Sequence, residues 1–309
     1  MFKIYKTNKS KLEILSDIEN DVWLNLENPN NDEINHITTK IGISKDIFNN
    51  VLDKDEISRI EITDNYKVII INYPYIASTK HKNKYNTMPL GIIIKDNFLV
   101  TVTLKNNHII DAYKNDPNFD TAKRTRFVID ILYNIAKEYL KCLQIINNEI
   151  SNKEDLILKS TENEDLINLL NIQKSLVYFL TSLKENGIVL DKIAKGNVLD
   201  LYMEDKELLE DAIIENNQGI ETVNIYREIL ASTTDTYATI VSNNLNKIMK
   251  FLAGITIVFS IPTMIASFIG MNVPLGIIAS NDYSFIILVG ISIVVSIIIA
   301  VILKKKNML

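Results

Sequence analysis

The chain has 309 residues, enough for one or two domains, and a formal net charge of −5 that is unevenly distributed. Residues 251–309 contain one acidic side chain and three lysines, a net charge of +2, which leaves −7 for the first 250 residues. This acidity argues against nucleic-acid binding, and the single cysteine, Cys142, excludes an intrachain disulfide and a zinc–thiolate cluster.

Residues 1–118 are predicted to form a cytosolic α/β domain, because alternating segments typical of strands surround two segments with helical spacing. The N-terminus lacks the apolar segment of a signal peptide, which places the first 250 residues in the cytosol. The predicted strands are 2–6, 12–15, 22–26, 58–62, 67–73, 91–95 and 98–104, and the predicted helices are 32–41 and 45–52. Turns at Asp64-Asn65 and Asp96-Asn97 would join neighbouring strands.

Residues 119–198 are predicted to form a helical hairpin region, since no proline occurs between Pro117 and Pro262 and apolar residues recur at helical spacing. Asp120 or Thr121 could cap the first helix, and the second is expected over 165–185. The turns predicted before a third helix are Asn186-Gly187 and Lys195-Gly196-Asn197.

The third helix is predicted to begin near residues 199–203 and to form a stalk over 199–247 that continues into the membrane. Extended to residue 269, it would be roughly 100 Å long at 1.5 Å per residue. A helix of that length must pack against neighbours or copies, because it is not stable alone in water.

Two apolar segments, 248–269 and 284–303, are long enough to span a bilayer. Lysines precede the first segment and form the tail at 304–309, whereas the loop at 270–283 has none. The positive-inside rule therefore predicts a multi-pass protein of the cell membrane with both termini in the cytosol. Two spans cannot enclose a channel, so conduction would require a homo-oligomer.

Small polar residues follow one face of the helix that leads into the first span, at alternating steps of three and four. Close helix packing and a water-facing wall both use such residues. The pattern keeps one phase from the charged segment through the apolar one, which favours a pore lining, and its 3.5-residue period favours several copies around an axis. We call these eleven positions the polar stripe: Ser232, Asp235, Thr239, Ser242, Asn246, Met249, Ala253, Thr256, Ser260, Thr263 and Ser267.

At the outer end of the first span stand Gly270, Met271 and Asn272. Placed between a pore-lining helix and a second span with a lysine-rich tail, this tripeptide resembles the motif of the CorA family of magnesium transporters. The resemblance covers the whole chain, including the strand with Trp23, the following Pro29, and the segments 89–92, 243–252 and 262–268.

The resemblance implies an α+β membrane protein, a funnel-shaped homopentamer with a cytosolic α/β domain and a stalk that continues into a two-helix transmembrane hairpin. The tripeptide would be the selectivity motif. The family's pore-facing positions correspond to Asn246, Met249, Thr256, Ser260, Thr263 and Ser267. The chain departs from the family at Ile269, where an aromatic residue is usual, and in having Asp282 as the one acidic residue of the loop.

The resemblance also implies passive Mg²⁺ uptake driven by the membrane potential and inhibited by Mg²⁺ bound between cytosolic domains. Because Mg²⁺ keeps its waters, neutral oxygens such as the Asn272 amide suit a filter for it. Met249 and Leu252 could form an apolar gate. Asp211 corresponds to a regulatory acidic residue, with Glu61 and Asp64 as candidate partners.

Two alternatives remain. A transporter of the same fold could carry Zn²⁺, Co²⁺ or Ni²⁺, and a membrane-anchored sensor or scaffold would conduct nothing. We expect no enzyme, because no nucleophile–base set converges, and no cofactor besides Mg²⁺ as transported and regulatory ion. The histidines, His36, His81 and His108, are expected at the surface and not in a metal site.

Overall fold

The computed structural model describes residues 2–9, 11–77, 85–157, 163–196, 198–271 and 283–308. Within these ranges it describes the side chains of all residues except those between 152 and 166. The chain divides into two compact units, Met1–Thr233 and Thr234–Leu309. Each unit is considered by itself.

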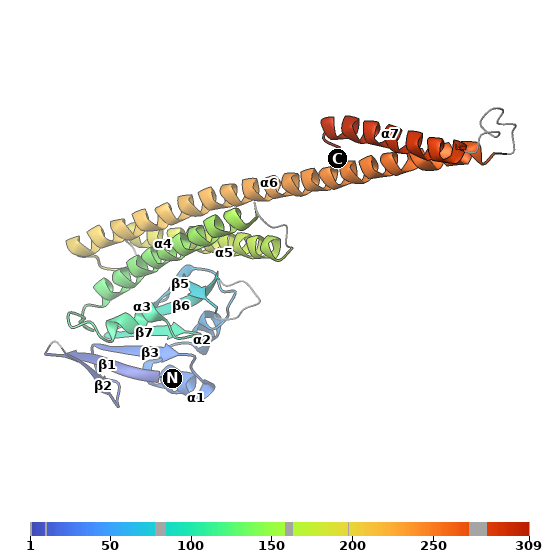
Figure 1. Ribbon diagram of the computed structural model, residues 1–309. Helices are drawn as coiled ribbons and strands as arrows, with labels where there is room; N and C mark the ends of the chain where they lie inside the picture. Colours follow the sequence, from blue (N-terminus) through green and yellow to red (C-terminus); the bar gives the residue numbers. More distant parts are fainter. Residues whose placement is uncertain are drawn as a thin grey trace. The chain divides into compact units, whose positions relative to one another are not determined.

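A mixed sheet forms the centre of the first unit (Figure 1). Its described strands are β1 (Phe2–Asn8), β2 (Lys11–Leu15), β3 (Val22–Glu27), β4 (Arg59–Ile62), β5 (Lys67–Ile76), β6 (Tyr85–Lys95) and β7 (Phe98–Thr103). They lie in the order β2-β1-β3-β7-β6-β5-β4, in which only β3 and β7 are parallel. The seven predicted strands are confirmed. β5 and β6 are longer than predicted because they pair with each other along their full lengths, from Lys67 opposite Ile94 to Ile76 opposite Tyr85.

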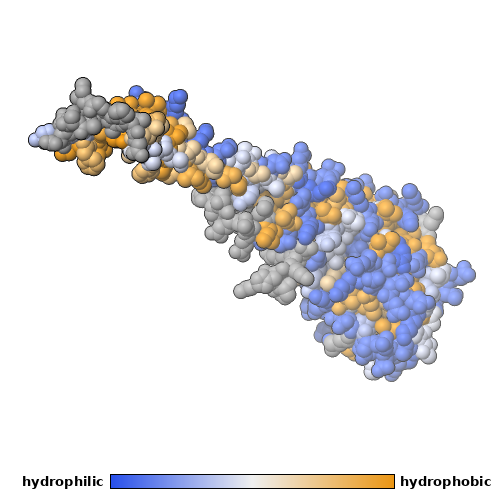
Figure 2. Space-filling model, turned by 90° about the vertical axis from the view of Figure 1, so that its right-hand side faces the viewer, coloured by the Kyte–Doolittle hydropathy of each residue, from blue (hydrophilic) through white to orange (hydrophobic). Residues whose placement is uncertain are grey.

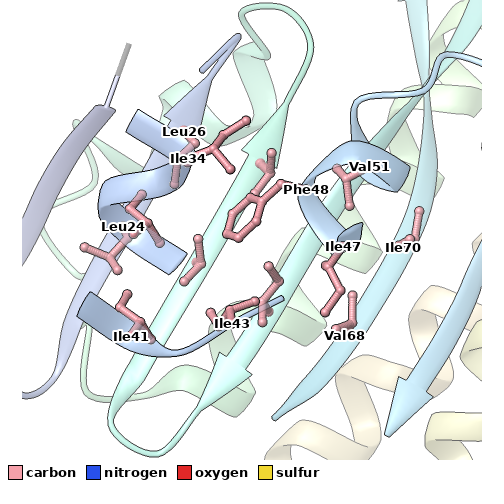
Figure 3. Packing of buried hydrophobic residues seen from close by; sticks show 14 of the residues in the cluster. Leu24, Leu26, Ile34, Ile41, Ile43, Ile47, Phe48, Val51, Val68 and Ile70 are labelled. Carbon is pink, nitrogen blue, oxygen red and sulfur yellow. The ribbon is translucent and has the colours of Figure 1, made fainter. Parts of the chain in front are cut away.

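Helices α1 (Asn31–Ile41) and α2 (Lys45–Val51) cover one face of the sheet, as predicted. Asn30 and Glu33 form a reciprocal capping box at the start of α1, which satisfies two exposed backbone N–H groups. Figure 3 shows the apolar side chains of both helices packed against sheet residues such as Leu24 and Ile70, all of them buried. Burial of this apolar surface stabilises the layer.

The opposite face of the sheet packs against α4 (Arg124–Ile157) and α5 (Asn163–Ala194). Trp23 lies edge-on to Phe127 of α4, with 5.1 Å between ring centroids. The prediction that Asp120 or Thr121 caps α4 was wrong. The Asp120 carboxylate accepts from the N–H of Ala122, and the Thr121 hydroxyl accepts from the N–H of Thr7, so both side chains hold the preceding turn instead.

The short helix α3 (His108–Tyr113) was not predicted. It has six residues, which is too few to establish a helical period in the sequence. Asn107 caps it by accepting from the N–H of Ile109, and this local hydrogen bond is what starts the helix.

The predicted turn at Asn186-Gly187 was also wrong, because α5 continues through both residues to Ala194. The pairing of β4 with β5 stops at Ile70, so β4 does not reach Asn72 of β5. The buried side-chain amide of Asn186 faces the backbone of Asn72 instead. Its nitrogen donates to the Asn72 carbonyl at 2.8 Å, and its oxygen accepts from the Asn72 N–H at 3.1 Å. The Asn186 amide thus satisfies the backbone N–H and C=O of Asn72, as a neighbouring strand would.

Gly187 allows the next helix, α6 (Met203–Ile269), to approach α5 closely. A Cβ at this position would lie 3.3 Å from the Asn216 side-chain nitrogen, which donates to the Leu183 carbonyl at 3.0 Å. The glycine therefore serves helix packing, and the turn forms at Gly196, whose φ of 86° is left-handed.

Replacing Asn186 with alanine should destabilise the first unit by about 1–3 kcal/mol, because it removes hydrogen bonds from buried backbone groups. We expect a lower thermal midpoint for the full chain in detergent. The matched change of exposed Asn217 to alanine should leave the midpoint within error. Equal midpoints for the two variants would contradict the role given to Asn186.

The predicted long helix is confirmed as α6 (Met203–Ile269), which is 67 residues long. The second apolar segment forms α7 (Ser284–Lys305), two residues longer than predicted. Within the second unit, α7 lies alongside the C-terminal part of α6 (Figure 1). Both helices are long and apolar enough to cross a membrane, with 6% and 11% of the tested windows buried. Figure 2 shows their hydrophobic residues gathered at the surface, as expected for surface that meets lipid or other copies.

Candidate functional site

The polar stripe lies entirely at the surface of α6. All eleven of its residues, from Ser232 to Ser267, are exposed in the single chain. Gly254 and Ile261 are buried instead, and each lies two residues before a stripe residue, Thr256 and Thr263. Two residues correspond to about 200° around a helix, so the stripe lies on the side of α6 opposite to the buried one.

An open groove of about 710 Å³ follows the outer half of this face. It brings together the four hydroxyl-bearing stripe residues of the span. Its lining consists of Ile255, Thr256, Phe259, Ser260, Thr263, Met264, Ser267, Phe268 and Met271. Sequence reasoning missed Phe259, Met264 and Phe268. Phe259 and Met264 lie three or four residues from stripe members, and this spacing would have placed both beside the stripe.

Three hydroxyl groups of the groove donate their only proton to the helix backbone. Thr256 donates to the Leu252 carbonyl at 2.8 Å, Ser260 to the Ile257 carbonyl at 2.8 Å, and Thr263 to the Phe259 carbonyl at 3.2 Å. Each oxygen then keeps only lone pairs for other partners. The groove therefore offers acceptors to whatever occupies it, which suits the water hydrogens of a hydrated cation and disfavours an anion.

Toward the N-terminal end of the predicted span, the same face becomes apolar. Met249 and Leu252 are each 56% exposed, one helical turn apart, and Leu252 comes one turn before Thr256. Asn246 is exposed one turn earlier still. If the stripe faces the axis of a ring of copies, Met249 and Leu252 form an apolar constriction between polar segments.

The tripeptide Gly270-Met271-Asn272, predicted to be the selectivity motif, lies only partly within the described residues. α6 ends at Ile269, and the N–H of Gly270 donates to the Ala266 carbonyl at 2.9 Å. Gly270 does not have a left-handed φ, and a Cβ there would meet described atoms no closer than 3.4 Å. The described part of its own chain therefore does not require glycine at this position. Asn272 lies outside the described residues, and Met271 is 53% exposed.

The residues expected in the regulatory site do not form a metal centre within one chain. Asp211 is exposed on α6, and Asp64 is exposed between β4 and β5. The Glu61 carboxylate is paired with Arg59 at 2.7 Å. Among the described residues, no group of three or more His, Cys, Asp or Glu side chains could hold a metal ion. A site at Asp211 would thus need ligands from elsewhere, such as another copy.

The two described histidines, His36 and His108, are exposed as predicted, and His81 lies outside the described residues. His108 lies 3.1 Å from the Glu138 carboxylate, and this hydrogen bond raises the pKa of the imidazole. Its role is to tie α3 to α4.

Comparison with known proteins gives consistent matches along the chain. The sequence model of a family described as CorA-like Mg²⁺ transporter protein matches residues 19–305. A relative from Methanocaldococcus jannaschii, named cobalt/magnesium transport protein CorA, is 28% identical over 93% of this chain and 90% of its own length. A relative of the same name from Thermotoga maritima is 21% identical, over 95% of this chain and 85% of its own length.

A solved structure described as the complete structure of the CorA magnesium transporter from Methanocaldococcus jannaschii is similar along its whole length. It has a TM-score of 0.86 and 26% identity, and the match covers 100% of this chain and 99% of that one. The full-length CmaX protein, at 11% identity and a TM-score of 0.73, shares the fold, with 98% of this chain and 97% of that one covered.

Proposed function

The chain belongs to the CorA-like Mg²⁺ transporter family, and we propose that it is a passive channel that admits Mg²⁺ into the cell and is closed by intracellular Mg²⁺. One observation carries this proposal: an exposed face with four hydroxyl-bearing residues follows an otherwise apolar membrane helix, and the hydroxyl groups of Thr256, Ser260 and Thr263 present acceptors only. Polar groups at membrane depth are expected where they meet a partner or water.

The proposed assembly is a homopentamer in which α6 lines the pore. The groove on α6 is open along one side in a single chain, and copies arranged around an axis would enclose it. Family membership supports five copies. The stripe's 3.5-residue period supports neighbouring copies of α6 in a left-handed supercoil.

In the proposed topology, residues 1–247 and the tail at 304–309 are cytosolic, and the loop at 270–283 is outside. The spans are 248–269 and 284–303. An inside-negative potential supplies about 4.6 kcal/mol per divalent ion per 100 mV, twice the value for one charge. This driving force makes uptake favourable without coupling to another reaction.

The proposed filter is a ring of Gly270 carbonyl and Asn272 amide oxygens that bind the hydrated ion. Neutral oxygens fit Mg²⁺, which releases its waters reluctantly. The hydroxyl acceptors of Thr256, Ser260 and Thr263 continue this environment toward the cytosol. Co²⁺ is the second candidate ion, because two relatives are named as cobalt/magnesium transport proteins.

The test is uptake of Mg²⁺ by liposomes that contain the purified protein, under an inside-negative potential. We expect saturable uptake that stops when the potential is collapsed, with Co²⁺, Ni²⁺ and Zn²⁺ added as competitors to rank the ions. Oligomers that insert correctly but pass no divalent ion would overturn the channel and favour a non-conducting sensor.

Replacing Asp211 with asparagine should weaken closure by internal Mg²⁺. Loss of one charged ligand should raise the internal Mg²⁺ concentration at which uptake is half-inhibited by roughly tenfold or more. The measurement is uptake against internal Mg²⁺ concentration. Exposed Glu207, on the same helix, is the matched control, and its change to glutamine should leave the half-closure concentration unchanged. An unaltered value for the Asp211 variant would remove this residue from regulation.

A further inference from the structure

Five lysines lie at one end of the second unit. Lys247 and Lys250 are on α6, Lys304 and Lys305 end α7, and Lys306 follows it; all five are exposed. Lys250 lies 19 residues before Ile269, and Lys304 lies 20 residues after Ser284, so each stretch spans about 30 Å of helix. Because α7 begins near the outer end of α6 and runs back along it (Figure 1), both groups of lysines reach the same level.

Lys247 lies on the side of α6 opposite to the nearby stripe residues, since it is seven residues before the buried Gly254 and two before Met249. Lys250 lies at the edge of the stripe, because it is four residues after Asn246 and three before Ala253. None of the five lysines is itself a stripe residue.

These lysines have no acidic partner in their own unit. Between residues 234 and 309, the acidic residues are Asp235 and Asp282. Asp235 precedes Lys247 by twelve residues, about 18 Å along the helix, and Asp282 belongs to the loop at the other end. Within the part of the chain that the structure describes, none of the five lysines forms an ion pair.

We propose that this lysine belt, Lys247, Lys250 and Lys304–Lys306, is a binding surface for anionic phospholipid headgroups of the cytosolic leaflet. The inference rests on the membrane-spanning, pore-lining role of α6 proposed above. A group of four to eight basic residues immediately cytosolic of a span attracts anionic lipid. A lysine on the outer side of the pore helix, such as Lys247, meets headgroups, whereas a lysine within the stripe would repel the transported cation.

The experiment counts lipids bound to intact oligomers by native mass spectrometry, with phosphatidylglycerol and phosphatidylcholine as probes. We expect the wild-type protein to retain phosphatidylglycerol preferentially, with an affinity that falls as salt rises. The variant Lys304→Gln/Lys305→Gln/Lys306→Gln should lose about fivefold in affinity for each lysine removed. The corresponding arginine variant should keep the preference, because it keeps the charge.

The matched control removes three exposed lysines from the first unit, as Lys184→Gln/Lys192→Gln/Lys195→Gln, and should bind phosphatidylglycerol like wild type. If the tail variant does not insert, Lys247→Gln/Lys250→Gln provides the same comparison. Equal affinity in the belt and control variants would overturn the proposal and would show that the lysines set topology alone.

Uptake of Mg²⁺ by the same preparation in pure phosphatidylcholine vesicles separates this inference from the channel. Uptake without any headgroup preference would overturn the lipid surface and leave the channel intact. Headgroup preference without uptake would overturn the channel and leave the surface in place.

Discussion

Replacing Asn272 with alanine is expected to abolish Mg²⁺ uptake by proteoliposomes, with a loss of at least about 100-fold. Loss of one hydrogen bond to a charged partner costs 1.5–3 kcal/mol, or one to two factors of ten. In a ring of copies every amide is lost at once. The substitution removes an oxygen that we propose binds the hydration shell of the ion at the outer end of the pore.

The control for this variant is Asn281→Ala, which removes an asparagine from the same loop outside the motif. It should transport like wild type. The variant Asn272→Asp adds a second comparison, because a ring of carboxylates should bind Mg²⁺ more tightly and release it more slowly. Wild-type uptake by Asn272→Ala would remove the motif from the ion pathway.

The triple variant Thr256→Val/Ser260→Ala/Thr263→Val is expected to lower Mg²⁺ uptake by about tenfold to 100-fold. It removes three hydroxyl oxygens that the structure places in one groove as acceptors. The remaining surface of this segment is apolar, so water and a hydrated ion lose their partners, as in a gate that closes by dewetting. The helix should persist, because these hydroxyl groups donate to their own helix.

Two controls separate the loss of acceptors from a general disturbance of the span. Thr256→Ser/Thr263→Ser keeps the hydroxyl groups and should retain uptake. Ser292→Ala removes a hydroxyl from α7 that also donates to its own helix, to the Leu288 carbonyl at 2.8 Å, but is buried and away from the groove. Uptake by the triple variant equal to that of Ser292→Ala would show that the groove does not carry the ion.

The strands, the long helix and the polar stripe could be predicted from the sequence, because each depends on the spacing of residues that are near in the chain. Alternation predicted the described strands of the sheet, and the long segment without proline before Pro262 predicted one continuous helix beginning near residues 199–203, which the structure has as α6. The stripe followed from spacing alone, since residues three and four apart share a face wherever a helix forms. Its exposure at every position from Ser232 to Ser267 is consistent with the interpretation as a pore lining.

Tertiary contacts decided the places where local chemistry was ambiguous. Asn186-Gly187 has the composition of a turn, but the Asn186 amide binds the backbone of β5, and Gly187 admits α6. Thr121 has the composition of a helix cap, but it binds Thr7, 114 residues away in the chain. In each case a distant partner competes with the local hydrogen bond, and the sequence does not show where that partner lies.

The sequence by itself therefore determined the membrane helices, the polar face and the motif, because each depends on residues that are near in the chain. Only the tertiary structure decided which side of α6 is buried, that three stripe hydroxyls are acceptors only, and that all five lysines of the belt are exposed. These properties depend on what a side chain contacts across space. For Asp211, which we propose is regulatory, the described residues of one chain hold no group of side chains that could bind a metal ion, so the proposed site needs ligands from elsewhere, such as another copy.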